Sequence, residues 1–355
     1  MLHDLLRAFG SPEVILDAST AALSRIVPAD VAQAVRSSRS APGTEGIDAT
    51  IEWASIAGNL LLTWDDERYP KALLQLTDPP PMLFCRGEPA RLNEPALAMV
   101  GSRNASPGGL QTAEEFAEAF ASSGVNVVSG LALGIDGAAH RGALKAAGPT
   151  STIAVIGTGI DRVYPARNRD LAHQIAGRGV IVSEFALGTP PLAYNFPRRN
   201  RLISGLSRGV LVVEAALNSG SLITARFAAE QGKDVFAIPG SIHSPFSKGC
   251  HRLIKDGAKL VETADDVLEE LGLAAAVTAP SPGSGRAGRA GRTTLDHLGE
   301  DDRQLLEALG YDPVSADEAV SRTGWAIERV LSTLIHLELG GSVARLPGDR
   351  VQRVS

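Results

Sequence analysis

The chain has 355 residues, with 34 Lys or Arg against 40 Asp or Glu, and therefore a formal net charge of -6. This balance excludes a uniformly basic coat for nucleic acid, so a polyanionic partner must meet a local basic patch. The length indicates two or three domains. Neither a signal peptide nor an apolar run long enough to span a bilayer is visible, which predicts a cytoplasmic protein.

The two cysteines, Cys85 and Cys250, have no CxxC spacing and no histidine cluster beside them. Free cysteine behaves as a small hydrophobic residue, so we expect two buried thiols. The sequence predicts no metal site and no cofactor.

Residues 1–55 are predicted to form a small all-helical domain. Apolar residues recur at helical spacing in "LLRAFGSPEVILDAS", where Ser11 and Pro12 form a cap followed by proline at the first helical position. Pro28 repeats the same signal. The unit is either a relative of DNA-binding helix-hairpin-helix modules or a docking module, and the second interpretation is the simpler one.

Residues 56–275 change to an α/β pattern, in which short runs rich in valine and isoleucine alternate with helical stretches. Near-continuous apolar runs are typical of strands buried on both faces of a parallel sheet. The alternation predicts right-handed crossovers with helices on both faces, which is a Rossmann-like core. The expected strands are "ALAMVGS", "VNVVSG", "TIAVIGTG", "GVIVSE", "GVLVVEAA", "DVFAIPG" and "AKLVET".

Residues 276–294 are predicted to be a flexible linker, because "AVTAPSPGSGRAGRAGR" is too rich in Pro, Gly and Ser to bury an apolar core. Residues 295–355 then show three helical stretches and a hairpin turning at "PGD", which is the order of a winged helix. The third helix carries Glu328, Arg329, His336 and Glu338 rather than a basic face. We therefore expect a protein contact there at least as much as DNA reading.

The loops after the predicted strands carry the candidate binding residues, because ligands of open α/β sheets bind at the carboxyl ends of the strands. In "VGSRNASPGG", a strand is followed by Gly101, Ser102 and Arg103, and then by Ser106 before a proline. Ser106 predicts a helix start, whose free N–H groups and dipole favour an anion. Arg103 adds a planar charge suited to phosphate. The alternative is that Ser106 only caps the helix and Arg103 is solvated.

The next two loops contain further glycines. In "VVSGLALGIDGAAHRGAL", a strand ends near Ser129, and Gly130 and Gly134 let the backbone approach a ligand. His140 follows on the helix, but no nucleophile motif accompanies it, so we expect a structural histidine that forms hydrogen bonds. "GTGIDRVYPARN" holds only part of a dinucleotide fingerprint and is weak support for NAD.

The run "NFPRRNRLISG" concentrates positive charge in an acidic chain. Phe196 supplies a stacking face, and Arg198, Arg199 and Arg201 supply phosphate partners, with Asn200 between them. This combination suits single-stranded nucleic acid, because every base has a π-face and every linkage a charge. The alternative places Phe196 in the core and the arginines in surface ion pairs.

These segments together resemble a known family. "VGSRNAS", "SGLALGIDGAAHRGAL", "GTGIDRVYP", "VSEFALGTPP", "FPRRNRLISGLS", "VLVVEAALNSGSLITARFAAEQGKDVFAIPG" and "KGCHRLIKDGA" resemble the DNA-processing protein A (DprA, or Smf) family over about residues 95–260. The resemblance implies an extended Rossmann core between an N-terminal sterile-alpha-motif-like domain and a C-terminal winged helix. It also implies a non-enzymatic protein that binds and protects incoming single-stranded DNA in natural transformation, helps load the RecA recombinase and dimerises through the Rossmann core.

The resemblance also suggests the binding residues. The family pocket uses the arginine of the G-[ST]-R motif, here Arg103, and the aromatic residue before Pro-x-Arg-Asn, here Phe196. Some relatives carry a lysine where this chain has Ala193, so we expect other arginines to take over phosphate contact. The expected DNA-binding set is Gly101, Ser102, Arg103, Ser106, Ser129, Gly130, Arg167, Phe196, Arg198, Arg199, Asn200 and Arg201.

Two other functions remain open from the sequence. A nucleotide phosphoribohydrolase-like enzyme shares the Rossmann layer, but its P-G-G-x-G-T-x-x-E run is replaced here by "IPGSIHSPFSKG". Glu184 and Glu214 end strands without an evident basic partner in the sequence, and no catalytic residue is assigned. A winged-helix transcription factor is the third reading, against which the acidic third helix counts.

Overall fold

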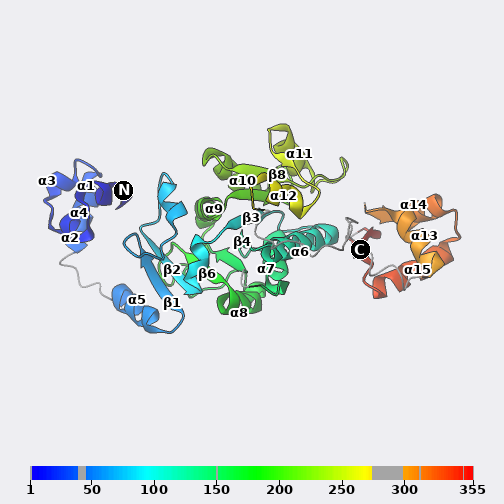
Figure 1. The fold of residues 1–355 in the computed structure, drawn as a ribbon, viewed down its shortest axis with the longest axis horizontal. Coiled ribbons are helices and arrows are strands. Elements are labelled where there is room, and N and C mark those ends of the chain that lie inside the picture. The colour runs from blue at the N-terminus through cyan, green and yellow to red at the C-terminus, as the bar shows by residue number, and fades with distance from the viewer. Residues whose placement is uncertain are drawn as a thin grey trace, which may run out of the picture.

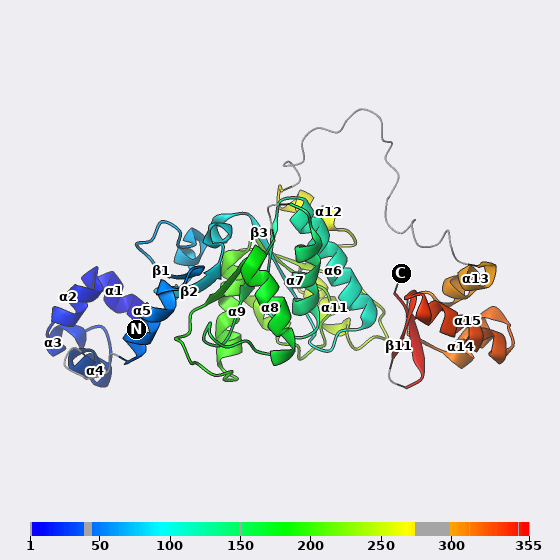
Figure 2. The same ribbon diagram turned by 90° about the horizontal axis from the view of Figure 1, so that it is seen from below.

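The computed structural model describes residues 2–38, 45–148, 151–273, 299–311, 313–346 and 348–354. Figures 1 and 2 show a cluster of helices at the N-terminus, a central sheet covered by helices, and a second helical unit at the C-terminus. Within the described residues, no helix is long and apolar enough to cross a membrane. The predicted linker at 276–294 lies outside the described residues.

The N-terminal helices pack around a small core of their own, formed by Leu5, Ile15, Leu23, Val27 and Ala32. The Ser11 hydroxyl accepts a hydrogen bond from the Val14 amide, as the cap-and-proline signal predicts. The four helices are α1 (Leu2–Phe9), α2 (Pro12–Asp17), α3 (Thr20–Leu23) and α4 (Ala29–Ser38).

Helix α5 (Glu45–Ser55) contacts the sheet rather than the N-terminal core. The Trp53 ring packs edge-on against Phe84, with ring centroids 5.6 Å apart. This helix falls within the part of the chain predicted to belong to the N-terminal domain. A single packing contact does not locate a domain boundary, so the boundary expected at residue 55 stays a prediction.

The central sheet has nine strands in the order β1-β2-β6-β5-β4-β3-β7-β8-β9 within the described residues. All seven predicted strands are present, and the strands from β3 to β9 run parallel to their neighbours among themselves. The mainly parallel α/β class is confirmed. These strands are β3 (Ala96–Val100), β4 (Asn126–Ser129), β5 (Thr152–Val155), β6 (Val180–Ser183), β7 (Gly209–Val212), β8 (Asp234–Ala237) and β9 (Lys259–Leu260).

Two strands that the sequence analysis did not name extend one edge of the sheet. Strand β2 (Met82–Gly87) pairs antiparallel with β6, and β1 (Asn59–Thr63) pairs antiparallel with β2. The parallel pairing predicted for the other seven strands does not extend to this edge. The connection between β1 and β2 contains a short 3-10 helix, η1 (Lys71–Gln75).

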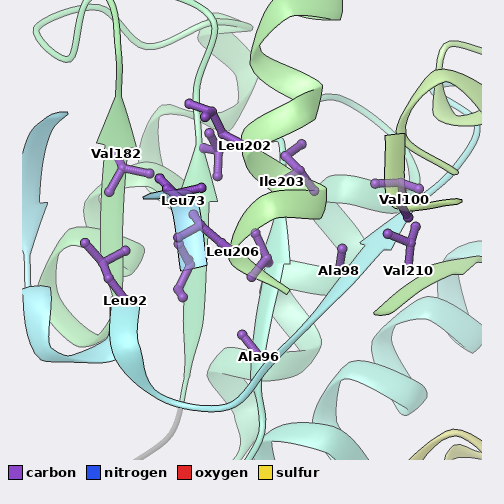
Figure 3. Packing of buried hydrophobic residues seen from close by; sticks show 14 of the residues in the cluster. Leu73, Leu92, Ala96, Ala98, Val100, Val182, Leu202, Ile203, Leu206 and Val210 are labelled. Carbon is purple, nitrogen blue, oxygen red and sulfur yellow. The ribbon is translucent and has the colours of Figure 1, made fainter. Parts of the chain in front are cut away.

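Helices cover both faces of the sheet and bury its alternate side chains. On one face, α9 (Asn195–Leu206), α10 (Ser221–Glu230) and α11 (Lys248–Lys255) pack on residues such as Ala98 and Val210 (Figure 3). The other face is covered by α6 (Pro107–Ser122), α7 (Ile135–Lys145), α8 (Arg169–Arg178) and α12 (Ala264–Glu270). Cys85 and Cys250 are buried free thiols, as predicted.

The C-terminal unit has the predicted order of three helices and a hairpin, around a core that includes Leu306, Val330 and Leu337. The exposed face of its third helix carries Ile327, Leu331, Ile335 and Leu339 rather than a row of basic side chains. The elements are α13 (Glu300–Leu309), β10 (Val314–Ser315), α14 (Ala316–Thr323), α15 (Ile327–Leu339), β11 (Val343–Leu346) and β12 (Arg350–Arg353).

Candidate nucleic-acid interface

The loops at the carboxyl ends of the parallel strands meet at one rim of the sheet. Strand β3 lies between β4 and β7, so the connections lead in opposite directions from this point. Ligands of open α/β sheets bind at such switch points. Backbone hydrogen bonds join the loops. The Ser102 amide donates to the Glu214 carbonyl at 2.7 Å, and the Ser102 carbonyl accepts from the Ile135 amide at 3.1 Å.

Arg103, Tyr164 and Phe196 form an aromatic and basic cluster at this rim. The Tyr164 and Phe196 ring centroids lie 5.7 Å apart, and the Arg103 guanidinium carbon lies 5.8 Å from the Phe196 centroid. Phe196 is half-buried because its ring rests on Gly157, where an added Cβ would approach the ring to 2.9 Å. Tyr164 is 48% exposed, and Arg103 is exposed as well. The cluster presents a π-face and a positive charge to solvent together.

The run "NFPRRNR" begins helix α9, and the helical repeat separates its three arginines. Arg199 is only 4% exposed, and its guanidinium donates to the Gly130 carbonyl at 2.6 Å and to the Val155 carbonyl. Burial lowers the pKa of Arg199 to about 10. The expectation that Arg199 contacts phosphate is therefore wrong in this structure, since the side chain instead joins the ends of β4 and β5 beneath the rim.

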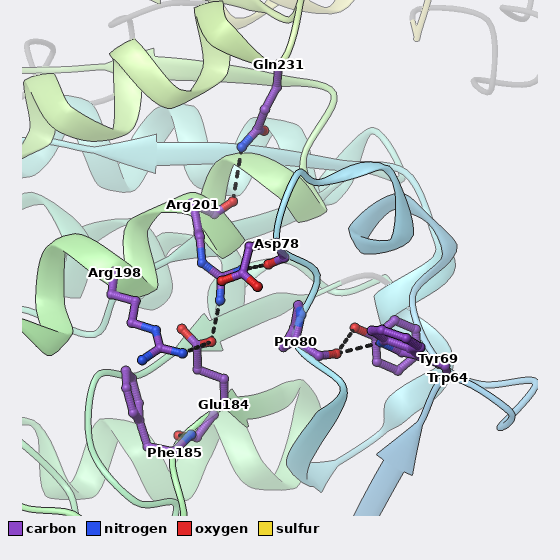
Figure 4. Close-up of polar contacts among 10 residues, drawn as sticks. Trp64, Tyr69, Asp78, Pro80, Glu184, Phe185, Arg198, Arg201 and Gln231 are labelled. Carbon is purple, nitrogen blue, oxygen red and sulfur yellow. Dashed lines mark hydrogen bonds and ion pairs between the residues drawn. The ribbon is translucent and has the colours of Figure 1, made fainter. Parts of the chain in front are cut away.

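Arg201 and Arg198 lie beside Glu184 (Figure 4). The helical repeat directs both of them away from the side of α9 that carries Phe196. Arg201 forms an ion pair with the Glu184 carboxylate and donates to the Asp78 carbonyl at 2.7 Å. Its side chain is 13% exposed. Arg198 is 57% exposed, and its nearest guanidinium nitrogen lies 3.8 Å from the same carboxylate. Of the three arginines, Arg198 is the one whose charge faces solvent.

The predicted anion site at the start of α6 contains an anion from the chain itself. Ser106 caps the helix by accepting the Gly109 amide at 3.0 Å. The Glu214 carboxylate accepts the Ser106 amide at 2.9 Å and its hydroxyl at 2.6 Å. Burial raises the pKa of Glu214, and the hydrogen bonds from Ser106 oppose that shift. The expectation of a DNA phosphate at Ser106 is corrected, because an internal carboxylate lies where the phosphate would bind.

Of the other predicted residues, some are buried and structural, and the others lie at or near the surface. The Ser129 hydroxyl is buried and donates to the Met99 carbonyl at 2.6 Å, so it does not face a ligand. Gly130 is also buried, since an added Cβ would meet Arg199 at 2.5 Å. Gly101, Ser102 and Asn200 are half-buried at the rim, and Arg167 is exposed beyond β5.

His140 is a structural histidine, as predicted. It is fully buried, shares a 2.6 Å hydrogen bond with the Thr152 hydroxyl and accepts the Leu131 amide at 3.3 Å. Burial lowers its pKa to about 3, so the ring is neutral near neutral pH. Its contacts hold α7 against the sheet and leave no path to a substrate.

Sequence reasoning missed two features of the rim. Tyr164 was not singled out, although an aromatic residue before a proline in a loop after a buried strand was a signal for it. The second feature is the partners of two carboxylates: Glu184 forms an ion pair with Arg201, and Glu214 accepts a hydrogen bond from the Ser106 hydroxyl. Arg201 lies 17 positions from Glu184 and Ser106 lies 108 positions from Glu214, and both separations exceed the reach of a local sequence pattern.

Residues 60–272 match the family model described as DNA recombination-mediator protein A, and residues 290–349 match the DprA winged helix domain. The chain belongs to the DNA recombination-mediator protein A family. Protein Smf of Escherichia coli is 43% identical to this family member over 309 residues, covering 87% of this chain and 81% of the relative. DNA processing protein DprA of Streptococcus pneumoniae is 49% identical over 205 residues, covering 58% of this chain and 72% of that relative.

Two solved structures of this family share the fold. The X-ray structure of DprA from Streptococcus pneumoniae matches with a TM-score of 0.66 and 38% identity, covering 76% of this chain and 92% of that one. DprA from Helicobacter pylori, described by its single-stranded DNA binding mode, matches with a TM-score of 0.54 and 32% identity. The match covers 59% of this chain and 95% of that one.

Proposed function

We propose that this chain binds single-stranded DNA at the rim formed by Arg103, Tyr164 and Phe196, as a DNA-processing protein of transformation. The observation that carries the proposal is the pair of neighbouring aromatic rings, tilted by 40° to each other, with a guanidinium beside them. Bases stack on aromatic faces whatever their sequence, and arginine pairs with phosphate. The likeness of the fold to DprA from Streptococcus pneumoniae and from Helicobacter pylori, the latter described by its single-stranded DNA binding mode, supports the assignment.

The acidic remainder of the chain gives this local cluster its selectivity. Duplex DNA attracts proteins mainly through long-range phosphate electrostatics, which a net charge of -6 weakens. Stacking needs bases that are not already paired, and only a single strand offers them. The chain therefore prefers single strands to duplexes.

We propose a binding role without catalysis. The carboxylates that end β6 and β7 are engaged by Arg201 and Ser106, and the histidine of α7 is enclosed. The family's name as a recombination mediator supports delivery of the bound strand to a recombinase. We propose that this recombinase is RecA and that the chain acts as a homodimer through its Rossmann-like core.

The test is fluorescence anisotropy with a labelled oligothymidylate and a labelled duplex of equal length. The expected result is tighter binding of the single strand, weakened by Phe196→Ala and by Arg103→Ala. Equal affinity for both ligands, unchanged in both variants, would overturn the proposal. Light scattering measures the dimer, a RecA strand-exchange assay measures loading, and a nucleotide hydrolysis assay addresses the enzymatic alternative.

A further inference from the structure

Glu184 is a buried carboxylate at the rim that the proposed stacking cluster does not use. Its side chain is 4% exposed, although it lies at the end of β6 where the loops reach solvent. One carboxylate oxygen, Oε2, meets both Arg201 and Arg198, and the other, Oε1, is buried without a hydrogen-bond partner. An ionised oxygen left without donors is costly, so this position calls for an explanation.

The two arginines beside Glu184 are held in different ways. Arg201 is fixed on three sides, because its guanidinium binds Glu184 and the Asp78 carbonyl while its own carbonyl accepts from Gln231 at 3.3 Å. The loop that carries Asp78 is itself fastened, since the Pro80 carbonyl accepts from Trp64 at 2.8 Å and Tyr69 at 2.5 Å (Figure 4). The Arg201 guanidinium is thus held by contacts within the protein.

Arg198 is not held in this way. Its guanidinium carbon lies 5.9 Å from the Phe185 ring centroid, and its 3.8 Å separation from Glu184 is too long for a hydrogen bond. Arg198 is two positions after Phe196 in the first turn of α9, so the helical repeat directs the two side chains to different sides of that turn, and Arg198 is the exposed one beside Glu184. Any phosphate that approaches Arg198 therefore meets a guanidinium that already lies beside the Glu184 carboxylate.

We propose that Glu184 acts as an internal competitor for the strand, holding Arg198 partly neutralised until a phosphate displaces the contact. This inference rests on the proposed single-strand binding at the rim and adds a residue that limits its affinity. With Glu184 ionised, Arg198 and Arg201 together contribute a net charge of about one rather than two. The chain thereby binds strands more weakly than its arginines allow, which favours their release to a partner.

The test uses Glu184→Gln, which keeps the side-chain size and an oxygen acceptor for Arg201. An oligothymidylate should bind about two- to fivefold more tightly, the range of an ion pair whose basic partner, here Arg198, is exposed to solvent. The magnitude of the log–log salt slope should rise by about 0.7, the value for one further phosphate contact on a single strand. Both changes should vanish when Glu184→Gln is made in an Arg198→Ala background.

Glu114→Gln is the matched control. It removes one carboxylate that pairs with two basic side chains, Arg141 and Lys145, on α7 and away from the rim. It changes the net charge by the same amount and should leave affinity and slope unchanged. An equal gain in both variants would reduce the effect to overall charge and overturn the proposal.

The remaining outcomes separate this inference from the proposed function. Loss of binding in Phe196→Ala together with wild-type affinity and slope in Glu184→Gln would overturn the role of Glu184 alone. A gain that persists in the Arg198→Ala background would also overturn it. Where Glu184→Gln gives no cooperative melt, Glu184→Asp draws the carboxylate back by one methylene, and an unchanged affinity and slope in it would overturn the proposal.

Discussion

The hydroxyl of Ser106 donates a 2.6 Å hydrogen bond to the carboxylate of Glu214, which lies 108 positions away along the chain. Together with the Ser106 amide, this contact neutralises the start of α6 with an anion that belongs to the protein. A sequence pattern that predicts an anion site at a helix start is thus correct about the chemistry. It cannot tell whether the anion arrives from outside or is built in.

A pH prediction follows from Glu214. Burial raises its pKa in the folded chain above the unfolded value, so the folded state holds the proton more tightly. The stability that this group contributes is present below the unfolded pKa and is lost as pH rises through the folded pKa. Glutamine at this position cannot ionise. The free energy of unfolding of Glu214→Gln, measured relative to the wild type, should therefore increase as the pH is raised from about 5 to about 7.5. Urea melts at both pH values measure this, and a constant difference would contradict it.

A second prediction concerns the aromatic pair. Phe196→Ala should weaken single-strand binding by about 1–3 kcal/mol, because one stacking platform is lost. The salt slope should stay the same, since stacking releases no counterions. Tyr164→Ala should act in the same direction. Salt titrations by anisotropy, with melting curves alongside, measure both effects; a large fall in melting temperature with normal affinity would make Phe196 a core residue instead.

A third prediction separates charge from stacking. Arg103→Ala should weaken binding of all base sequences equally, because phosphate contacts carry no base information. The magnitude of its salt slope should fall by about 0.7. Arg141→Ala removes an equal charge that is paired with Glu114, and it should change neither quantity. A shift in base preference at unchanged affinity would exclude the phosphate role of Arg103.

A fourth prediction distinguishes Arg199 from its neighbours. Arg199→Met leaves the buried carbonyls of Gly130 and Val155 without their donor, so the free energy of unfolding should fall by about 3 kcal/mol or more. Arg198→Ala, in contrast, removes an exposed side chain and should barely change the melt. Urea melts of the two variants decide this. Equal melts would mean that Arg199 is not a structural residue.

A fifth prediction concerns the C-terminal unit. A chain ending at residue 275 should fold and retain single-strand affinity, because Arg103, Tyr164 and Phe196 all lie in the central part. The measurement is anisotropy with the shortened chain, after a cooperative melt has shown that it folds. Loss of binding by the folded truncate would move the main site to the winged helix.

Most of the fold could be predicted from the sequence, because buried parallel strands leave runs that are apolar on both faces. "TIAVIGTG" and "GVLVVEAA" are of this kind, and both form central strands. Strands β1 and β2 escaped notice because "NLLLT" and "MLFCRG" lie among loops and short 3-10 turns rather than between helices. Their antiparallel pairing follows from contacts that no local pattern encodes.

The candidate site was predictable in its residue types and less so in its geometry. Arg103 and Phe196 were recognised from their motifs, and the Arg103 guanidinium carbon lies 5.8 Å from the centroid of the Phe196 ring. The sequence analysis did not predict the helix that begins at Asn195, because the residue before it, Tyr194, supplies no capping side chain that would mark a helix start. Once that stretch is helical, adjacent arginines point in different directions, and Arg199 enters the core while Arg198 stays outside.

Arg103, Tyr164 and Phe196 come from three separate segments, namely the loop after β3, the loop after β5 and the start of α9, and only the assembled sheet brings them together. The unfolded chain has no such surface, so a bound strand stabilises the folded state alone. At a concentration one hundred times its dissociation constant, a ligand of this kind adds about 2.7 kcal/mol to the free energy of unfolding. On the proposed function, the incoming strand is a folding ligand, and the protein resists unfolding most when DNA is there to be processed.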